Sequence, residues 1–510
     1  MIKIRKYLTV FYTVLFMIIF CMILFIDKNI EYANKNNCDV SNIVLLIVGI
    51  IITVIVVIGY YRYFACYLQK RNKKECYFLL ITANIVLFFI QLYIFKNIYF
   101  ESNWDCGMLA EVSEGLAYHN YDINFGFSGD YFSRYPNNVW LTFVLTVIKK
   151  VNIWIGLETP YFATVLTGIA GVNLSVFFLT LIVNELTKDR QCSALAWIMA
   201  AVYLGLSPWC SIPYSDIFSM YFTVWIFYLY VRRNYAKYAL LRWFFITLLS
   251  FIGYQIKPTV IIVWIAILIY QILSVKSKKE LLKKGCQVII LSGICSLTMD
   301  YSTDMIKNNI GFIPDDNKSF SIAHYAMMGL NEATTGGFYS DDVEYSASFS
   351  SVKERTDGNI KRIKERVKGR GISENLSFFI RKLIMNYNDG SFAWAKEGDF
   401  FKTISSPPNI WISVGLRHFY YGENNVVIYN IMQMIWLIIL GLNIVAGWSC
   451  LKSEAEEKSV IFLTLIGITL FVLLFEGRAR YFILYSPYYI ISAVIGLKYL
   501  LGKVFPADLF

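Results

Sequence analysis

Apolar runs of about twenty residues recur along this chain from end to end, and that is the length a helix needs to cross a bilayer. Of the 510 residues, 57% are hydrophobic and only 16% are charged. Ordinary globular chains carry about a quarter charged residues, so a soluble protein is excluded. The pattern predicts an all-α polytopic membrane protein.

Twelve of these runs are expected to span the membrane, with both termini in the cytoplasm. Basic clusters at 70–74 and 276–284 mark cytoplasmic ends, because Lys and Arg accumulate on that side. The first run follows basic residues and has no small-residue cleavage site, so it is interpreted as a retained helix and not a signal peptide. The expected spans are 7–26, 43–62, 78–98, 160–186, 192–211, 217–231, 239–255, 259–274, 285–303, 427–449, 459–475 and 481–500.

The apolar segment 139–148 is expected to be a helix at the outer interface. It has only ten residues before Lys149 and Lys150, which is too short to span. Counting it as a span would place every later basic cluster outside. With it at the interface, Asp105 and Arg134 both lie on the outer side.

The net charge of +11 does not indicate a nucleic-acid partner, because the basic residues stand at the ends of apolar runs. The ten cysteines show no CxxC or other metal-ligand spacing. No metal site is therefore predicted from the cysteines, although a divalent metal stays open as a cofactor.

Almost all polar residues of chemical interest fall on the expected outer side, at helix ends or in loops. Ionisable groups near hydrocarbon are costly, so their gathering there favours a functional site. The alternative is that each residue is polar only because it lies in an outer loop, or because its long side chain extends its charged end to the membrane surface. The set comprises Asp105, Arg134, Asp216, Lys257, Arg478 and Arg480.

Asp105 follows the third expected span by about seven residues. A carboxylate there can act as general base toward an acceptor hydroxyl. It can equally cap the helix predicted by the apolar periodicity from Met108 to Leu116. The residue chemistry leaves both roles open.

Arg478 and Arg480 lie two residues apart before the last span, and guanidinium groups suit phosphate through fixed, paired donors. Lys257 and Arg134 are candidates to join them, and anchoring to lipid headgroups is the alternative. Asp216 is expected to support this basic cluster, bind a metal or cap the span at 217–231. His324 is a metal or acceptor contact, or simply packs in its loop.

The long polar stretch at about 304–426 is expected to be an ordered outer segment. Residues 351–385 carry a helical charge pattern and end in an apolar stretch. The pattern predicts a small helical lid or platform packed on the outer mouth.

Four motifs give the chain a family resemblance. They are Asp105 with the downstream run Ala110–Ala117, Ser133–Asn138 (Ser-Arg-Tyr-Pro-Asn-Asn), Pro213–Asp216 (Pro-Tyr-Ser-Asp), and Arg478–Tyr481 (Arg-Ala-Arg-Tyr). Over about 78–500 the chain resembles the GT-C superfamily of membrane glycosyltransferases. It looks most like the bacterial relatives of protein O-mannosyltransferases and the lipid A aminoarabinose transferase.

The resemblance implies a GT-C-like core and a polyprenyl-phosphate-sugar donor, most simply undecaprenyl phosphate in a bacterial plasma membrane. It implies that Asp105 is the base, that the sugar is transferred with inversion, and that Arg134, Lys257 and Arg480 hold the donor phosphate beside Arg478. Tyr135, Asp216, His324 and Tyr481 take supporting or acceptor-side roles. The expected regions are two added N-terminal helices (1–77), a core (78–303) with a catalytic first outer loop (98–159), the lid (304–426) and C-terminal helices (427–510).

The departures from the family pattern bear on the acceptor. Cys106 follows Asp105 where protein O-mannosyltransferases show an acidic pair, and Arg-Tyr-Pro-Asn replaces the Lys-Pro-Pro of the aminoarabinose enzyme. The expected acceptor is therefore a glycan or glycolipid, such as a cell-wall or surface polysaccharide. A lipid-linked oligosaccharide flippase and an O-antigen-type polymerase remain the rival interpretations.

Overall fold

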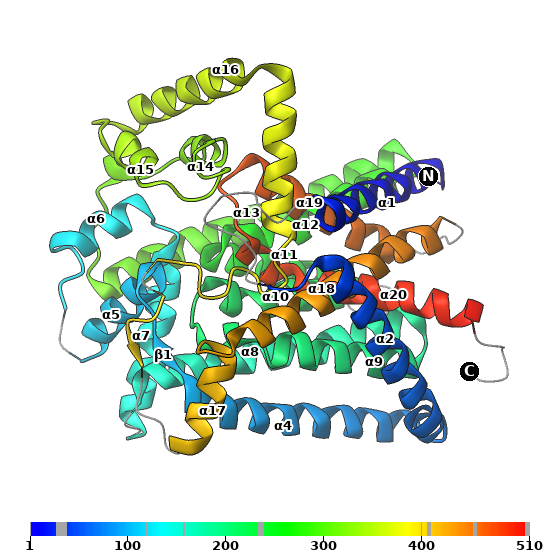
Figure 1. Ribbon diagram of the computed structural model, residues 1–510. Coiled ribbons are helices and arrows are strands. Elements are labelled where there is room, and N and C mark those ends of the chain that lie inside the picture. The colour runs from blue at the N-terminus through cyan, green and yellow to red at the C-terminus, as the bar shows by residue number, and fades with distance from the viewer. Residues whose placement is uncertain are drawn as a thin grey trace.

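The computed structural model describes residues 2–26, 38–118, 121–156, 159–232, 239–398, 400–404, 410–451 and 456–504. Within these ranges the chain is almost wholly helical (Figure 1). The one sheet there is a two-residue antiparallel pair of β1 (Phe100–Glu101) with β2 (Thr403–Ile404). The predicted all-α class is confirmed.

Nine helices in the described ranges are long and apolar enough to cross a membrane. They are α1 (Ile2–Phe25), α2 (Asn42–Tyr60) continued through a π turn (Tyr61–Ala65) into α3 (Cys66–Gln69), α4 (Lys73–Ile98), α8 (Pro160–Thr187), α11 (Ala239–Ile256), α13 (Lys278–Ile310), α18 (Asn425–Cys450), α19 (Glu456–Leu474) and α20 (Ser486–Val504), the last preceded by a 3-10 turn (Ala479–Tyr485).

Three of the expected spans fall on shorter elements. They are α9 (Arg190–Ala200) with its π turn (Ala201–Gly205), α10 (Ser215–Val231), and α12 (Ile261–Leu273) after a 3-10 turn (Pro258–Val260). Each of the twelve expected spans therefore contains a helix, although only nine meet the length and hydropathy requirement for crossing.

The long helices α4, α8, α18 and α20 run along a common direction (Figure 1). Several polar side chains pair across the bundle, as a low-dielectric interior favours. The Tyr12 hydroxyl of α1, for example, donates to Asn443 Oδ1 of α18 over 2.7 Å. Asn443 Nδ2 in turn donates to the carbonyl oxygen of Tyr489 on α20 over 2.9 Å.

One end of the bundle carries α5 (Trp104–Tyr118), α6 (Gly126–Arg134) and α7 (Asn138–Trp154). Helix α7 covers the short apolar run expected at the interface but continues past Lys149. That lysine is fully buried, and its Nζ donates to the Ala110 carbonyl oxygen at 2.6 Å and to Glu114 Oε2 at 3.2 Å. Helix α7 is therefore fastened to α5.

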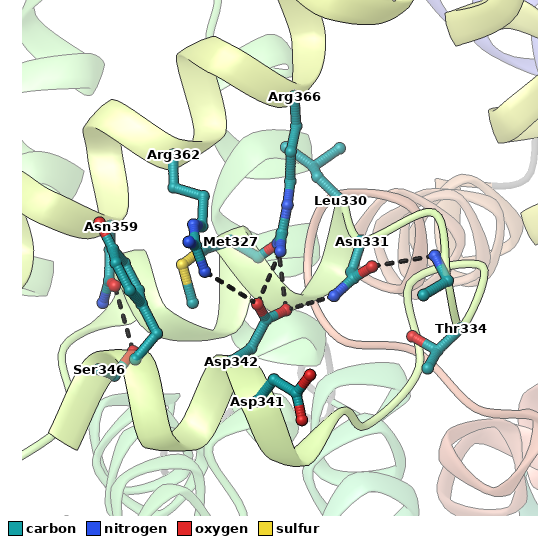
Figure 2. A network of polar contacts seen from close by, with 12 residues as sticks. Met327, Leu330, Asn331, Thr334, Asp341, Asp342, Ser346, Asn359, Arg362 and Arg366 are labelled. Carbon is teal, nitrogen blue, oxygen red and sulfur yellow. Dashed lines mark hydrogen bonds and ion pairs between the residues drawn. The ribbon is translucent and has the colours of Figure 1, made fainter. Parts of the chain in front are cut away.

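The lid helices are α14 (Ile322–Gly329), α15 (Ser340–Ala347) and α16 (Val352–Tyr387), and they follow a 3-10 turn (Asp316–Lys318). Figure 2 shows the contacts that hold them together. The buried Asp342 carboxylate of α15 accepts from Arg366 Nη2 of α16 at 2.6 Å and from Asn331 Nδ2 at 2.8 Å. Arg366 Nη1 donates to the Met327 carbonyl oxygen of α14, so one arginine joins all three helices.

Helix α16 bends at Gly371, whose φ of 67° lies in the left-handed region that favours glycine. The chain after α16 enters the bundle before α17 (Ile410–Tyr420). Gly390 N donates to Gln433 Oε1 of α18 at 2.6 Å, and Trp209 Nε1 of the 3-10 turn Pro208–Ser211 donates to the Ser391 carbonyl oxygen at 2.9 Å. This part of the long polar stretch is thus packed within the bundle.

Candidate active site

Five segments that are distant in sequence bring charged side chains together at the α5–α7 end of the bundle. These are the start of α5 (Asp105), the start of α10 (Asp216), the connection between α11 and α12 (Lys257), the loop after α16 (Glu397) and the turn between α19 and α20 (Arg478, Arg480). All except Glu397, which lies in a loop, are at or near a helix end, so their side chains reach the cluster without breaking a helical core.

Arg480 lies at the centre of the cluster and is 6% exposed. Its Nε lies 3.8 Å from Asp216 Oδ2 and 3.4 Å from Glu397 Oε1. Nevertheless its Nε and Nη1 are buried and have no hydrogen-bond partner, and neither do the two facing carboxylate oxygens. Buried donors without partners are rare in folded proteins. Nε faces the two carboxylates, so Nη1 is the donor that is left for a ligand.

Aromatic rings hold the Arg480 guanidinium in place. Its Cζ lies 4.6 Å from the centre of the Trp104 ring and 5.3 Å from that of Tyr214. Those two rings meet edge to face at 4.8 Å. Cation–π contacts of this kind fix the plane of the guanidinium and therefore the direction of its donors.

Lys257 and Asp216 form a buried ion pair beside Arg480, through Lys257 Nζ and Asp216 Oδ1. The same Nζ lies 4.8 Å from the centre of the Tyr481 ring. Burial lowers the pKa of Lys257, and the neighbouring Asp216 carboxylate opposes that shift. Asp216 thus contacts two cations, Lys257 and Arg480.

Glu397 is a site residue that the sequence did not nominate. Its Oε2 accepts from Arg478 Nη1 at 3.2 Å while Oε1 faces Arg480. The loop before it is strained, because Phe392, Ala393 and Ala395 all have φ between 56° and 59°. Asp389 holds that loop by accepting from Ser391 N, Ala393 N and Lys396 Nζ.

Asp105 lies in the first turn of α5, after Trp104 turns the chain with a φ of 29°. The Tyr214 hydroxyl donates to Asp105 Oδ2 at 3.3 Å, and Tyr131 also hydrogen-bonds to this carboxyl group. Burial raises the pKa of Asp105, and the positive charge of Arg480 lowers it in part. A carboxylate whose pKa is raised by burial is a stronger base than an exposed carboxylate.

The lid closes over this cluster through main-chain contacts. Glu476 N donates to the Tyr325 carbonyl oxygen at 2.9 Å, and Gly477 N donates to that of Gly336 at 3.0 Å. The close approach requires Gly329, because a Cβ there would lie 2.2 Å from the carbonyl carbon of Phe475. Burial raises the pKa of Glu476, whose Oε2 accepts from the Tyr481 hydroxyl at 3.2 Å.

Three nominated residues stand apart from the central contacts. Arg134 is partly exposed on α6, where Nη2 lies 3.8 Å from Asp130 Oδ2. Its neighbour Tyr135 lies near Asp105. Burial raises the pKa of Tyr135, and the charge of Asp105 raises it further.

His324 faces into the lid, with Nδ1 2.7 Å from Ser346 Oγ, and burial lowers its pKa to about 4. Burial raises the pKa of the adjacent Tyr325, and the nearby charges of Glu476 and Asp105 raise it further, so Tyr325 lies closer to the site than His324 does.

The arrangement combines the half-buried Asp105 carboxylate with three cations, Lys257, Arg478 and Arg480, which are held in place by the carboxylates of Asp216 and Glu397. It can bind an anionic oxygen at Arg480 and accept a proton at Asp105, because Trp104 and Tyr214 link both groups. In the part of the chain that the structure describes, no group of three or more His, Cys, Asp or Glu side chains is arranged to hold a metal ion.

The fold and the cluster together define an all-helical integral membrane protein with a buried charged site at one end of its bundle. The chain belongs to the family described as conserved hypothetical integral membrane proteins, which matches residues 1–500. A search of curated proteins finds no match to the chain.

Solved structures that are similar to the chain include oligosaccharyltransferases from Archaeoglobus fulgidus. One is AglB in complex with an inhibitory peptide and a dolichol-phosphate, at 10% identity and a TM-score of 0.44, with 82% of this chain and 50% of that chain covered. Another, tethered with an acceptor peptide, has 10% identity and a TM-score of 0.43, with 84% and 50% covered. A third, in complex with Zn and sulfate, has 10% identity and a TM-score of 0.39, with 78% and 49% covered. The chain thus spans about half the length of these structures, and TM-scores below 0.5 carry no argument about its activity.

Proposed function

We propose that this protein is a membrane glycosyltransferase that moves a sugar from a polyprenyl-phosphate donor to an acceptor hydroxyl, with inversion. The observation that carries the proposal is Arg480, whose buried Nε and Nη1 lack hydrogen-bond partners beside Lys257 and Arg478. A phosphate oxygen would accept from Nη1, because Nε already faces the carboxylates of Asp216 and Glu397. Guanidinium groups bind phosphate through such fixed, paired geometry.

Asp105 is the proposed general base. The acceptor oxygen attacks the anomeric carbon as its proton passes to the Asp105 carboxylate, and the bond from that carbon to the donor phosphate oxygen breaks. Polyprenyl phosphate leaves with the electron pair, and its charge is stabilised by Arg480, Lys257 and Arg478. A phosphate leaving group needs positive charge more than a proton, so a single proton-accepting carboxylate suits the step, with Asp216 and Glu397 holding the cations in place.

The finer features of the proposal rest on the sequence resemblance. They are a GT-C-type core, an undecaprenyl phosphate donor, a cell-wall or surface polysaccharide acceptor, and a site on the outer face of a bacterial plasma membrane. Arg134 and Tyr135 of the Ser133–Asn138 motif would then lie toward the lid side of the donor. A divalent metal is the one candidate cofactor, and the assay below tests it with a chelator.

The test is transfer of radiolabelled sugar from a panel of undecaprenyl-phosphate sugars in membranes, with and without a divalent-metal chelator. Asp105→Asn should abolish turnover in well-expressed protein. Glu111→Gln, which changes an exposed carboxylate on the same helix α5, should leave it intact. Equal turnover in Asp105→Asn and wild type would remove Asp105 as the base. No turnover with any donor, in folded protein, would favour the polymerase or flippase.

A further inference from the structure

The second half of α16, residues 372–387, has a surface that the proposed function does not use. We call these residues the arm of α16. The arm is 16 residues long, or about 24 Å at the rise of an α-helix. In Figure 1 it runs across the direction of the long helices α4 and α20, while the first half of α16 lies with α14 and α15.

The inner end of the arm is fixed at the end of the bundle. Lys382 Nζ donates to the carbonyl oxygens of Leu473 and Phe475 at 3.1 and 2.7 Å, which places the arm beside the last turn of α19. The Tyr387 hydroxyl shares a hydrogen bond of 2.6 Å with Thr469 Oγ1. The Tyr387 ring also meets the Phe16 ring of α1 edge to face. The arm therefore leaves the bundle at the level where α19, an expected membrane span, ends.

One face of the arm is apolar along its whole length. Residues spaced by three or four positions share a helix face, and this face carries Ile372, Leu376, Phe379, Ile380 and Leu383. The exposed fraction is 92% at Ile372 and 62% at Leu376, and the other three are half-buried. The opposite side carries the exposed Ser373, Glu374 and Ser377.

This apolar face continues the lipid-facing surface of a span. Leu470 and Leu474 of α19 are 49% and 53% exposed, as expected for side chains that meet acyl chains. Leu474 lies between the two residues whose carbonyl oxygens bind Lys382, and Leu383 is the residue that follows Lys382 in the arm. An aqueous location would expose a large apolar surface at the tip of the arm, whereas a lipid location buries it.

We infer that the arm of α16 lies in the membrane interface, with Ile372 and Leu376 inserted at the boundary between headgroups and acyl chains of bilayer phospholipid. Its occupant is the bilayer and not a second protein, because the apolar face is continuous with that of α19. The polar Ser373 and Ser377 side faces water. The lid is thereby attached to the membrane at one end and to the turn before Arg478 at the other.

Photocrosslinking of the full chain tests this inference independently of any transferase activity. A benzophenone amino acid is placed at position 372, 376, 374 or 360 in separate variants. Each protein is irradiated in vesicles of phosphatidylglycerol and phosphatidylethanolamine that contain fluorescent phosphatidylglycerol and no polyprenyl lipid. Position 289 on the span α13, where Ile289 is 72% exposed, shows that lipid labelling works.

Lipid labelling at 372 and 376 should exceed that at 374 on the water-facing side, and at 360 in the first half of α16, by at least about fivefold. These positions are exposed, so folding should survive. Equal labelling at 374 and 372 would overturn the inference. So would absence of labelling at 372 and 376 while 289 is labelled, or adducts between two protein chains.

Discussion

Arg480 makes two kinds of contact that a lysine cannot reproduce. Its guanidinium lies over Trp104 and at the same time between Asp216 and Glu397. Arg480→Lys keeps the charge but loses the planar stack and the paired donors. Because a hydrogen bond to a charged group contributes about 1.5–3 kcal/mol, binding of undecaprenyl phosphate should weaken by roughly 10- to 150-fold.

The measurement is the Kd for undecaprenyl phosphate with purified protein in detergent. Arg381→Lys is the matched control, because Arg381 lies on the arm of α16 and pairs with Glu332 at 3.1 Å, apart from the cluster. The control should bind like wild type. An unchanged Kd in Arg480→Lys would mean that the phosphate binds elsewhere.

The sequence identified much of this cluster but not its full membership. Asp216, Lys257, Arg478 and Arg480 were nominated because they lie at predicted outer helix ends, and position relative to a span fixes depth in the membrane. Depth in the membrane does not show on which side of the bundle a residue lies. The sequence therefore places Arg134 with this cluster, whereas in the structure its ion pair is with Asp130.

Other residues of the cluster left no usable signal. Glu397 falls within the long polar stretch, where hydropathy marks no boundary. Tyr131 is one of 37 tyrosines and stands in no motif, and Tyr214 belongs to the Pro213–Asp216 motif but has no role assigned by it. Their roles follow from a strained loop and from hydrogen bonds that only the folded chain brings together.

At the scale of elements, Lys382 is the connection between α16 and the turn before Arg478. Its side chain is fully buried, and Nζ donates to the carbonyl oxygens of Gly329, Leu473 and Phe475. Burial lowers its pKa from 10.5 to about 7. When this contact opens to water the pKa returns toward 10.5, so between these values the open state binds more protons than the closed one.

Opening of the Lys382 contact should therefore become less frequent as pH rises from 7 toward 9, by up to about tenfold per pH unit. Hydrogen exchange of the peptide covering 471–478, corrected for intrinsic exchange rates, measures this opening. Lys382→Met should remove the pH dependence, whereas Lys368→Met, at an exposed position on the same helix, should retain it. Opening that does not change between pH 7 and 9 would show that Lys382 stays charged in the closed state.

Helix boundaries show where hydropathy stops being informative. The expected span at 285–303 is the apolar centre of α13, which begins at Lys278 and ends at Ile310. The segment 139–148 likewise became α7 over Asn138–Trp154. A helix extends beyond its apolar run because its main-chain hydrogen bonds continue through polar residues. The side chains of those residues find partners of their own, as Lys149 does with Glu114.

At the scale of the whole molecule, the charged residues divide between the two ends of the bundle. The end opposite the cluster holds Arg190, whose Nη1 donates to the Arg71 carbonyl oxygen, and Lys498, whose Nζ donates to that of Thr187 at 2.6 Å. The lysine-rich segments at 70–74 and 276–284 adjoin the helices that start at this end. Positive residues favour the cytoplasmic side, so the site is expected to face outward.

Labelling of single introduced cysteines in intact cells tests that orientation. Lys353→Cys lies on the exposed side of α16, and Lys278→Cys lies at the exposed start of α13, at the opposite end of a span from Gly311. An impermeant maleimide should add label to Lys353→Cys in intact cells, above the level of the parent protein. It should label Lys278→Cys only after the membrane is permeabilised. The reverse pattern would place Asp105 and Arg480 in the cytoplasm, where the sugar would have to come from a donor on the inner leaflet.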